Sequence, residues 1–475
     1  MRNHKTRIER LIDNSPLKPM HYKIWTLSAL GVFMDGLDLF IIAVALPLIN
    51  IEFLPTKWEL GFIGAASPIG AIFGATGLGY LTDRIGRKKL YVGSMILFVV
   101  FSFFCAIAWN VESLILFRFL LGIGIGADYP ISSTYLSEFM PKNVRSRAIM
   151  SAFSFQALGA LGGATLGLIV LIFHPHADAW RWMLALTIIP AVIIGIARTQ
   201  LPESALWLQS KRRFKEAAEV VSQVIGKPSH KIVHLVENDR FALNTELQKK
   251  VYYHELFTSK FIRQTLLTSV PWFIMDICLY GVGVFSAMIL AMVFSNYSKP
   301  TDTLAQNFIL SDIRATTGSV FLDMFLVVGF ISAIFAVKKL GTIRLQNLGF
   351  IGMTIGLVIL GFATYFNHSE VWVFLGFAIF NLMVNFGPNP TTYMLPTERF
   401  PSYIRASGHG FAASSGKIGA AVGIFFLPVF IKSIGTSLSM FILAGCSFSG
   451  FICTLILSRA THTKHSGSHN PHDQQ

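Results

Sequence analysis

The stretch TSVPWFIMDICLYG, residues 268–281, is the first half of a long apolar run that contains a single carboxylate, Asp276. Trp272, Asp276 and Tyr280 follow one another at intervals of four residues, so a helix would place them in one stripe. A carboxylate within a membrane-spanning helix is energetically costly and marks a candidate functional site. The alternative is a structural role, in which Asp276 accepts hydrogen bonds between helices.

The composition of the whole chain is that of a polytopic membrane protein. Of its 475 residues, 53% are hydrophobic and 13% are charged, whereas a soluble chain carries about a quarter charged residues. The four cysteines lie in apolar runs and are spaced for neither a disulfide framework nor a zinc site. The net charge of +14 comes from Lys and Arg in the loops, which membrane topology explains better than nucleic-acid binding.

Apolar runs of about 20 residues, each long enough to cross the hydrocarbon core of a bilayer as a helix, recur along the chain. They form two groups of six, at 24–46, 60–81, 90–109, 113–136, 148–173 and 180–200, and at 264–295, 318–337, 347–366, 371–395, 406–431 and 436–458. We therefore predict an all-α membrane protein with twelve transmembrane helices in two pseudo-symmetric six-helix bundles.

The predicted domain organisation follows from these groups. The first bundle with its N-terminal extension occupies 1–200, a polar linker 201–263 and the second bundle 264–458. A tail at 459–475 contains histidines among Ser, Gly and Asn, and disorder explains it better than metal binding. These histidines are His462, His465, His469 and His472.

The loops between the runs alternate in basic charge. Lys and Arg are concentrated in the N-terminal extension, in 84–89, in 142–147, and in the loops after the eighth and tenth runs. By the positive-inside rule both termini are cytoplasmic, and the protein is expected in the cell membrane. The N-terminus lacks the apolar core and cleavage site of a signal peptide.

An internal repeat supports the two-bundle prediction. EFMPKNVR at 138–145 and ERFPSYIR at 398–405 share the spacing E-x-x-P-x-x-x-R and follow the fourth span of each half. Two repeated halves with a site between them are typical of transporters.

Polar residues from both halves lie at similar predicted depths. At 1.5 Å per residue they are about 10–18 Å from the cytoplasmic boundary. They are Tyr129, Gln156, Asp276, Asn389 and Lys417. Lys417 either forms a permanent ion pair with Asp276 or shares an anionic substrate with it. A central site open alternately to each side requires such groups from both halves.

Three further carboxylates lie in the first half. Asp35 and Asp38 are one helical turn apart, and Asp128 precedes Tyr129. Carboxylates within a membrane suit a proton carrier, although Asp35 has the alternative of anchoring a neighbouring helix. Pro130, Pro388 and Pro390 predict broken helices beside the site, and the glycine-rich run 159–167 predicts close helix packing.

The sequence resembles the major facilitator superfamily in GYLTDRIGRK at 79–88 and LPESALWL at 201–208. Within it, three stretches resemble the phosphate:proton symporters of fungi and plants: GIGIGADYPIS at 122–132, the Trp272–Asp276–Tyr280 stripe, and NFGPNPTTY at 385–393 continuing to SGHGFAASSGKIG at 407–419. Leu37, Ala127 and Pro390 depart from that family's pattern.

This resemblance implies roles for individual residues. Phosphate would be bound by Tyr129, Gln156, Trp272, Asp276, Tyr280, Asn389 and Lys417, and protons would be carried by Asp35, Asp38 and Asp128. Charged residues at the cytoplasmic ends of the spans are expected to form ion pairs that hold the outward-open state. They are Asp83, Arg84, Arg87, Glu138, Arg145, Glu203, Glu398 and Arg405.

The expected function is import of inorganic phosphate with protons by alternating access. No cofactor beyond the proton and no enzyme activity are expected, because no nucleophile–base pair or metal cluster is visible. The expected partners are a small anion and the bilayer, with no nucleic acid, and the chain is expected to act as a monomer. Two alternatives are a proton symporter for an organic or aromatic acid and a nutrient sensor that binds its ligand without moving it.

Overall fold

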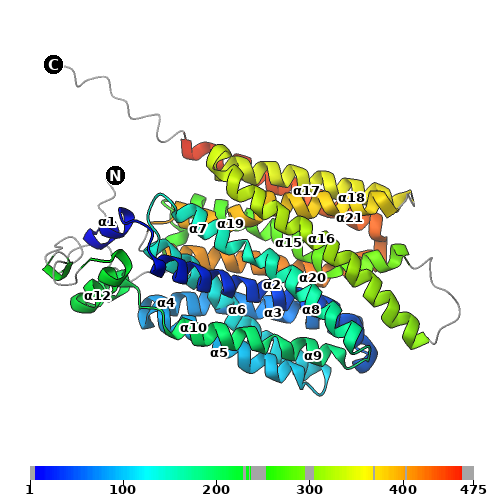
Figure 1. Cartoon of the computed structure of the whole chain (residues 1–475). Coiled ribbons are helices and arrows are strands. Elements are labelled where there is room, and N and C mark those ends of the chain that lie inside the picture. The colour runs from blue at the N-terminus through cyan, green and yellow to red at the C-terminus, as the bar shows by residue number, and fades with distance from the viewer. Residues whose placement is uncertain are drawn as a thin grey trace.

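A computed structural model describes residues 6–227, 232–234, 236, 253–294, 304–366, 370–401 and 404–462. All regular structure within these residues is helical, and twelve helical segments are long and apolar enough to span a membrane. They lie side by side along one direction (Figure 1). The predicted all-α class and the number of spans are confirmed.

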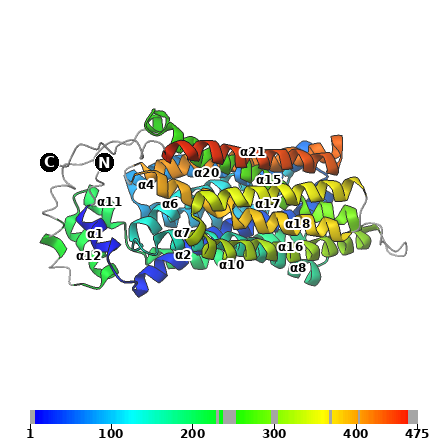
Figure 2. The same cartoon turned by 90° about the horizontal axis from the view of Figure 1, so that it is seen from above.

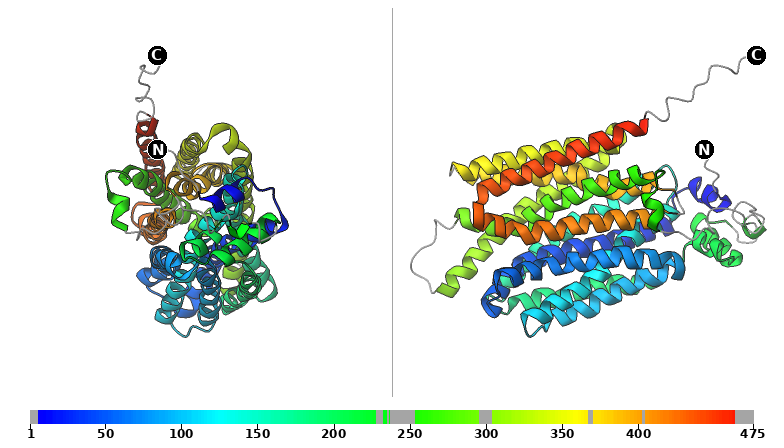
Figure 3. Two further views of the ribbon diagram at one scale, coloured as in Figure 1. Left: turned by 90° about the vertical axis from the view of Figure 1, so that its left-hand side faces the viewer. Right: turned by 180° about the vertical axis from the view of Figure 1, so that it is seen from behind.

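The first half consists of α2 (Pro19–Phe53), α3 (Lys57–Phe73) continued by the π-helical η1 (Gly74–Leu78) and α4 (Gly79–Ile85), α5 (Arg87–Ala106), α6 (Val111–Phe139), α7 (Arg145–Phe153), α8 (Phe155–Phe173), α9 (Ala179–Leu186) and α10 (Ile188–Thr199). The second half consists of α15 (Ile262–Phe294), α16 (Leu304–Leu340), α17 (Thr342–Tyr365), α18 (Glu370–Phe386), α19 (Pro388–Arg399), α20 (Arg405–Ile434) and α21 (Thr436–His462). Seen end-on, the two halves lie next to each other (Figure 3).

The short helices α1 (Arg7–Asp13), α11 (Ala205–Ser210) and α12 (Phe214–Ile225) gather at one end of the bundle, hereafter the α12 end (Figure 2). α11, α12 and the 3₁₀ turn η3 (Tyr253–Phe257) belong to the predicted linker. Much of that linker, 228–231, 235 and 237–252, lies outside the described residues, as do 463–475 of the predicted tail. The boundaries at 200, 263 and 458 therefore remain a prediction.

Glycines allow α2 and α8 to pack closely. A Cβ added at Gly36 would lie 2.1 Å from the carbonyl oxygen of Gln156, and one at Gly159 would lie 2.0 Å from that of Phe33. Neither helix tolerates a side chain there without moving. The close packing predicted for 159–167 is confirmed.

The two halves contact each other at both ends of the bundle. At the end away from α12, Phe425 of α20 packs against Trp58 and Phe62 of α3, with ring centroids 5.6 and 5.2 Å apart. Toward the α12 end, Phe153 of α7 stacks on Tyr393 of α19 at 4.0 Å. The structure is therefore closed by aromatic contacts on both sides of its centre.

One helix break occurs where it was predicted, at the Pro388–Pro390 segment, and another occurs at Ser154, where none was predicted. Gly387 separates α18 from α19, so that Pro388 begins α19, and Ser154 separates α7 from α8. The break expected at Pro130 is wrong, because α6 continues through it. Gly126, one turn earlier, lies directly against α3, since a Cβ there would be 2.1 Å from the carbonyl oxygen of Ala71. Packing between neighbouring helices keeps a proline-containing membrane helix continuous.

Candidate functional site

Lys417 of α20 is the centre of the candidate site, because its ammonium group joins the two halves. Its Nζ lies 3.2 and 3.4 Å from the two carboxylate oxygens of Asp35 on α2. The hydroxyl oxygens of Tyr129 and Tyr280 lie 3.1 and 3.3 Å from the same nitrogen. Lys417 is only 3% exposed, so these groups replace the water that a buried ammonium loses.

The carboxylate of Asp35 accepts hydrogen bonds from three helices. Lys417 reaches it from α20, the Tyr129 hydroxyl from α6, and Gln156 Nε2, at 2.8 Å, from the first turn of α8. The break at Ser154 gives Gln156 this position at the start of a new helix. An ammonium, a phenol and an amide thus surround one buried oxyanion, and we call these three groups the oxyanion cradle.

Asn389 fixes the orientation of the Gln156 amide. Its Nδ2 donates to Gln156 Oε1 at 3.2 Å and to Asn385 Oδ1 at 2.8 Å, while Asn385 Nδ2 donates to the carbonyl of Leu326 at 3.1 Å. With its oxygen engaged in this way, Gln156 presents its NH₂ group to Asp35 and to the hydroxyl of Tyr280, 2.9 Å away. The break at Gly387 places Asn389 in the first turn of α19.

Trp272 and Asp276 lie beside the cradle and against Gly416 of α20. A Cβ at Gly416 would lie 2.6 Å from Trp272 Nε1 and 2.9 Å from Asp276 Oδ2. Within the described part of the chain, the Asp276 carboxylate makes no ion pair or direct hydrogen bond. The alternative of an ion pair between Lys417 and Asp276 is therefore wrong for this structure, since Lys417 pairs with Asp35.

The other two predicted proton carriers lie apart from Lys417, each with an arginine. Both oxygens of Asp38 lie 3.3 Å from the guanidinium of Arg118. Asp128 lies 2.5 and 3.1 Å from the guanidinium nitrogens of Arg198. Both arginines are fully buried, and these bidentate pairs join helices within the first half.

Arg198 was missed by the sequence analysis. It lies in the last turn of a predicted span, where a basic residue is expected to face the membrane surface. The only signal in the sequence was the presence of three carboxylates in the spans of the first half, since a buried carboxylate requires a cation or a proton. Asp323, in the middle of the eighth run, was also missed.

Within the described part of the chain, the direct contacts of the predicted gate residues fall into several groups, and Arg405 of the second half also interacts electrostatically with Glu138 and Arg145 of the first. Arg87 and Glu138 form an ion pair at 3.0 Å, and Glu203 accepts from the backbone N–H of Arg87 at 2.8 Å. Arg84 lies near the end of α4 and has a partner, while the side chain of Asp83 is outside the described part.

The remaining gate residues show the internal repeat. Arg145 binds the carbonyl of Met140 at 2.8 Å and Asp13 of α1 at 2.5 Å. Arg405 donates to the carbonyl of Phe400, also five residues earlier, at 3.3 Å. Glu398 accepts from the Thr342 hydroxyl at 3.0 Å. The repeated arginines thus bind backbone rather than the repeated glutamates.

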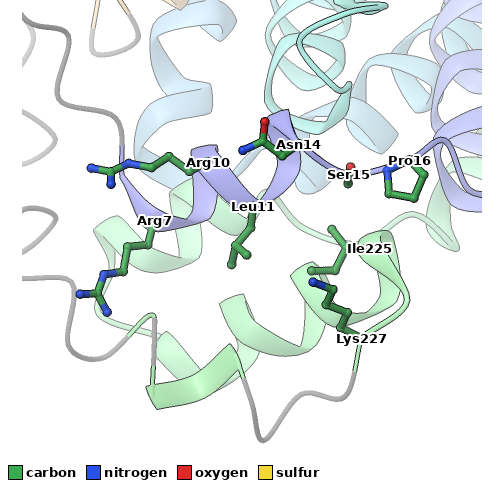
Figure 4. Close-up of a pocket in the computed structure, with 8 residues that line it drawn as sticks. All are labelled: Arg7, Arg10, Leu11, Asn14, Ser15, Pro16, Ile225 and Lys227. Carbon is green, nitrogen blue, oxygen red and sulfur yellow. The ribbon is translucent and has the colours of Figure 1, made fainter.

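A small cavity lies beside the candidate site, and a larger cavity lies away from it. One of about 20 Å³ lies beside the cradle, lined in part by Gln156, Tyr280 and Asn389. A larger one of about 340 Å³ lies at the α12 end (Figure 4). Its lining comprises Arg7, Arg10, Leu11, Asn14, Ser15, Pro16, Ile225 and Lys227. None of the predicted site residues lines this larger cavity.

The family of the chain follows from a comparison with protein-family models. The model described as sugar (and other) transporter matches residues 24–466. The chain belongs to the sugar (and other) transporter family. Family and fold both point to a membrane transporter.

Several relatives and solved structures resemble this transporter over most of its length. It is 29% identical over 485 residues to putative inorganic phosphate transporter 1-13 of Oryza sativa subsp. japonica, covering 96% of this chain and 92% of the relative. It is 28% identical over 454 residues to putative metabolite transport protein YaaU of Escherichia coli (strain K12), covering 95% of each.

Among solved structures, this transporter resembles the major facilitator superfamily proton:xylose symporter XylE from E. coli. The TM-score is 0.74 at 19% identity, covering 92% of this chain and 95% of the other. The match confirms the predicted major facilitator fold.

Proposed function

We propose that this transporter carries inorganic phosphate in symport with protons by alternating access. The observation that carries the proposal is the oxyanion cradle, formed by donors from both halves around a single buried negative charge. Phosphate is an oxyanion that accepts from the same donors. Relatives named inorganic phosphate transporters support this substrate.

In the proposed cycle, phosphate replaces the Asp35 carboxylate in the cradle. A proton on Asp35 removes its charge and frees Lys417, Tyr129 and Gln156 to bind phosphate. Asn389 and Tyr280, which contact Gln156, and Trp272, beside Gly416, contribute further donors, and Asp276 donates when it is protonated. The negative charge beside Lys417 is then supplied by the substrate.

The replacement of the Asp35 carboxylate by phosphate couples phosphate transport to proton transport through the charge next to Lys417. A proton on Asp35 without phosphate leaves the Lys417 ammonium buried without a counter-ion, which disfavours closure of the two halves. Phosphate without the proton puts two anions beside one ammonium. Only the empty, ion-paired state and the doubly loaded state close readily, so protons and phosphate move together.

We also propose that the protein acts as a monomer in the cell membrane, with both termini in the cytoplasm. The basic loops favour cytoplasmic termini in the cell membrane. The site is complete within one chain, which fits function as a monomer. The proton is the only coupling ion that the proposal needs.

The proposal is tested by uptake into proteoliposomes that contain the purified protein. Labelled phosphate should accumulate under an inward proton gradient and should leave again when a protonophore collapses that gradient. Parallel assays with labelled benzoate, a small dicarboxylate and D-xylose define specificity. Accumulation of a carboxylic acid or of xylose without phosphate overturns the substrate, and binding of phosphate without uptake indicates a sensor.

A further inference from the structure

Asp323 of α16 is a buried carboxylate outside the oxyanion cradle. It is 3% exposed, and its Oδ2 has no hydrogen-bond partner among the residues that the structure describes. Within the described part of the chain its carboxyl group makes no ion pair. It lies about 25 Å along the helix axis from Leu340, well within the membrane-spanning segment.

The buried face of α16 leads from the end opposite α12 toward the cradle. Thr316, Ser319, Asp323 and Leu326 are all buried and recur at helical spacing on that face. Thr316 Oγ1 also has no partner among the described residues. Leu326, one turn beyond Asp323, lines the small cavity beside Gln156 and Asn389. A polar stripe therefore approaches the site along the second half.

Charged and titratable groups on the neighbouring helices do not neutralise Asp323. The helices packed against α16 are α18, α8, α15, α17, α7 and α2. Near the middle of these helices, the described titratable groups are Asp35 and Asp38 on α2, and Asp276, Cys278 and Tyr280 on α15. Nearer the helix ends, the described titratable groups are His21, Tyr22, Lys23 and Glu52 on α2, Arg145 and Arg147 on α7, Arg263 on α15, and Arg344 and Tyr365 on α17. The described side chains of α8 and α18 include none. On α16 itself, the described basic residues are Arg314, Lys338 and Lys339.

If Asp323 were ionised, none of the described cations or hydrogen-bond donors would offset the cost of burying its charge. Burying a charge without a partner costs far more free energy than burying the neutral acid. α16 packs against α8 of the other half, so Asp323 lies in a helix that must separate from that half when the transporter opens. Leu326, one turn from Asp323, lines the small cavity together with Gln156, Ala157 and Ala160 of α8. Separation of α16 from α8 would admit water next to this turn and allow the Asp323 carboxyl group to ionise.

We propose that Asp323 is a proton-binding site that must hold a proton for α16 to close against α8. The ligand is a proton, and the site deepens the proposed proton coupling without depending on phosphate as the substrate. Bound at Asp323, a proton permits closure of the contact between α16 and α8. Bound at Asp35, a proton exchanges the internal anion for the substrate.

Infrared difference spectroscopy of the purified protein tests the bound proton directly. The closed wild-type protein should show a protonated carboxyl band that shifts in D₂O and is absent from Asp323→Asn. Asp323→Glu should restore a band at a shifted frequency, which also controls for folding. Glu112→Gln, a neutralised exposed carboxylate, should leave the spectrum unchanged. A spectrum of Asp323→Asn that retains the band overturns the inference.

Backbone amide exchange of α8 and α16, corrected for the intrinsic effect of pH, tests the link to closure without substrate. Wild-type exchange should rise with pH as Asp323 ionises, and Asp323→Asn should remain protected at high pH. The same pH dependence in both proteins overturns the inference, and so does protection by Na⁺ at constant pH, which indicates a metal-cation site.

The transport assay separates this inference from the proposed function. Asp323→Asn should retain phosphate exchange at equal pH, whereas net proton-driven uptake should fall about tenfold, a typical size for a lost coupling. If the carboxyl band is present but phosphate is not carried, the substrate fails and the proton site stands. If phosphate is carried and net uptake is unaffected in Asp323→Asn, the proton site fails alone.

Discussion

At the scale of single residues, the pairing of Lys417 with Asp35 determines how the site behaves. Both side chains are at most 4% exposed, and the pair joins one half of the molecule to the other. The sequence predicts that both residues lie in spans and are functional. The alternative partner predicted for Lys417 was Asp276, because a sequence gives the depth of a residue along its helix but not the rotation of the helix.

The losses of stability from removing the two members of this pair should not be additive. Lys417→Ala leaves a buried carboxylate unpaired and Asp35→Asn a buried ammonium, each at a cost of about 3–5 kcal/mol. The double variant should be more stable than the sum of the single effects predicts, yet phosphate uptake should be absent from all three. Thermal unfolding in detergent and proteoliposome uptake measure the two quantities. Additive losses of stability contradict the pairing.

Gly416 should be required for transport because of its neighbours. A methyl group there meets Trp272 Nε1 and Asp276 Oδ2 at under 3 Å, so Gly416→Ala must displace the stripe on α15. We expect phosphate uptake to fall about 10–100-fold, in the range given by a displacement of about 1 Å at a binding site. Gly445→Ala is the matched control, since nothing lies within 4 Å of its Cβ. Equal uptake in both variants excludes a role for this contact.

At the scale of elements, helix breaks present the polar side chains at the site. Gln156 and Asn389 both lie in the first turn of a helix that follows a break. The sequence predicted the spans and the break near Pro388, because length, hydropathy and proline act locally. It was wrong at Pro130, because continuity of α6 depends on packing against α3, and packing is not visible in a single sequence.

Gly387, at the break between α18 and α19, should not tolerate a side chain. A Cβ there would lie 2.5 Å from Gly349 Cα and 2.6 Å from the carbonyl oxygen of Leu345. Gly387→Ala should push α19 away from α17 and move Asn389, so that phosphate affinity falls and the midpoint of thermal unfolding drops. Gly93→Ala, with open space around its Cβ, serves as the control. Unchanged binding in Gly387→Ala would show that Asn389 does not orient Gln156.

At the scale of the whole molecule, two six-helix halves enclose a polar centre and meet at both ends. The repeat of E-x-x-P-x-x-x-R predicted equivalent halves, and the equivalent contacts of Arg145 and Arg405 with backbone carbonyls bear this out. The arrangement of charges between helices was predicted less well. Arg118 and Arg198 pair with Asp38 and Asp128 across the first half, and only three-dimensional contact shows such pairs.

The aromatic contact away from the α12 end should hold that end shut. Phe425→Ala removes the ring that lies between Trp58 and Phe62, so α3 and α20 should separate more often there. Amide exchange over 58–64 should rise in this variant, while exchange at the α12 end stays constant. Phe430→Ala, on the same helix and partly exposed, should change neither. An equal rise at both ends would indicate general loosening of the fold.

The Asp35 carboxylate also acts as an internal competitor of phosphate for Lys417. A carboxylate held within hydrogen-bonding reach of Lys417 competes with phosphate as an intramolecular ligand, at an effective concentration that does not depend on the medium. The measured affinity for phosphate therefore includes the free-energy cost of displacing the Asp35 carboxylate from Lys417. Asp35→Asn should bind phosphate more tightly, although it no longer accumulates phosphate. The Asp35 carboxylate thus weakens phosphate binding, and the same carboxylate makes proton-coupled transport possible.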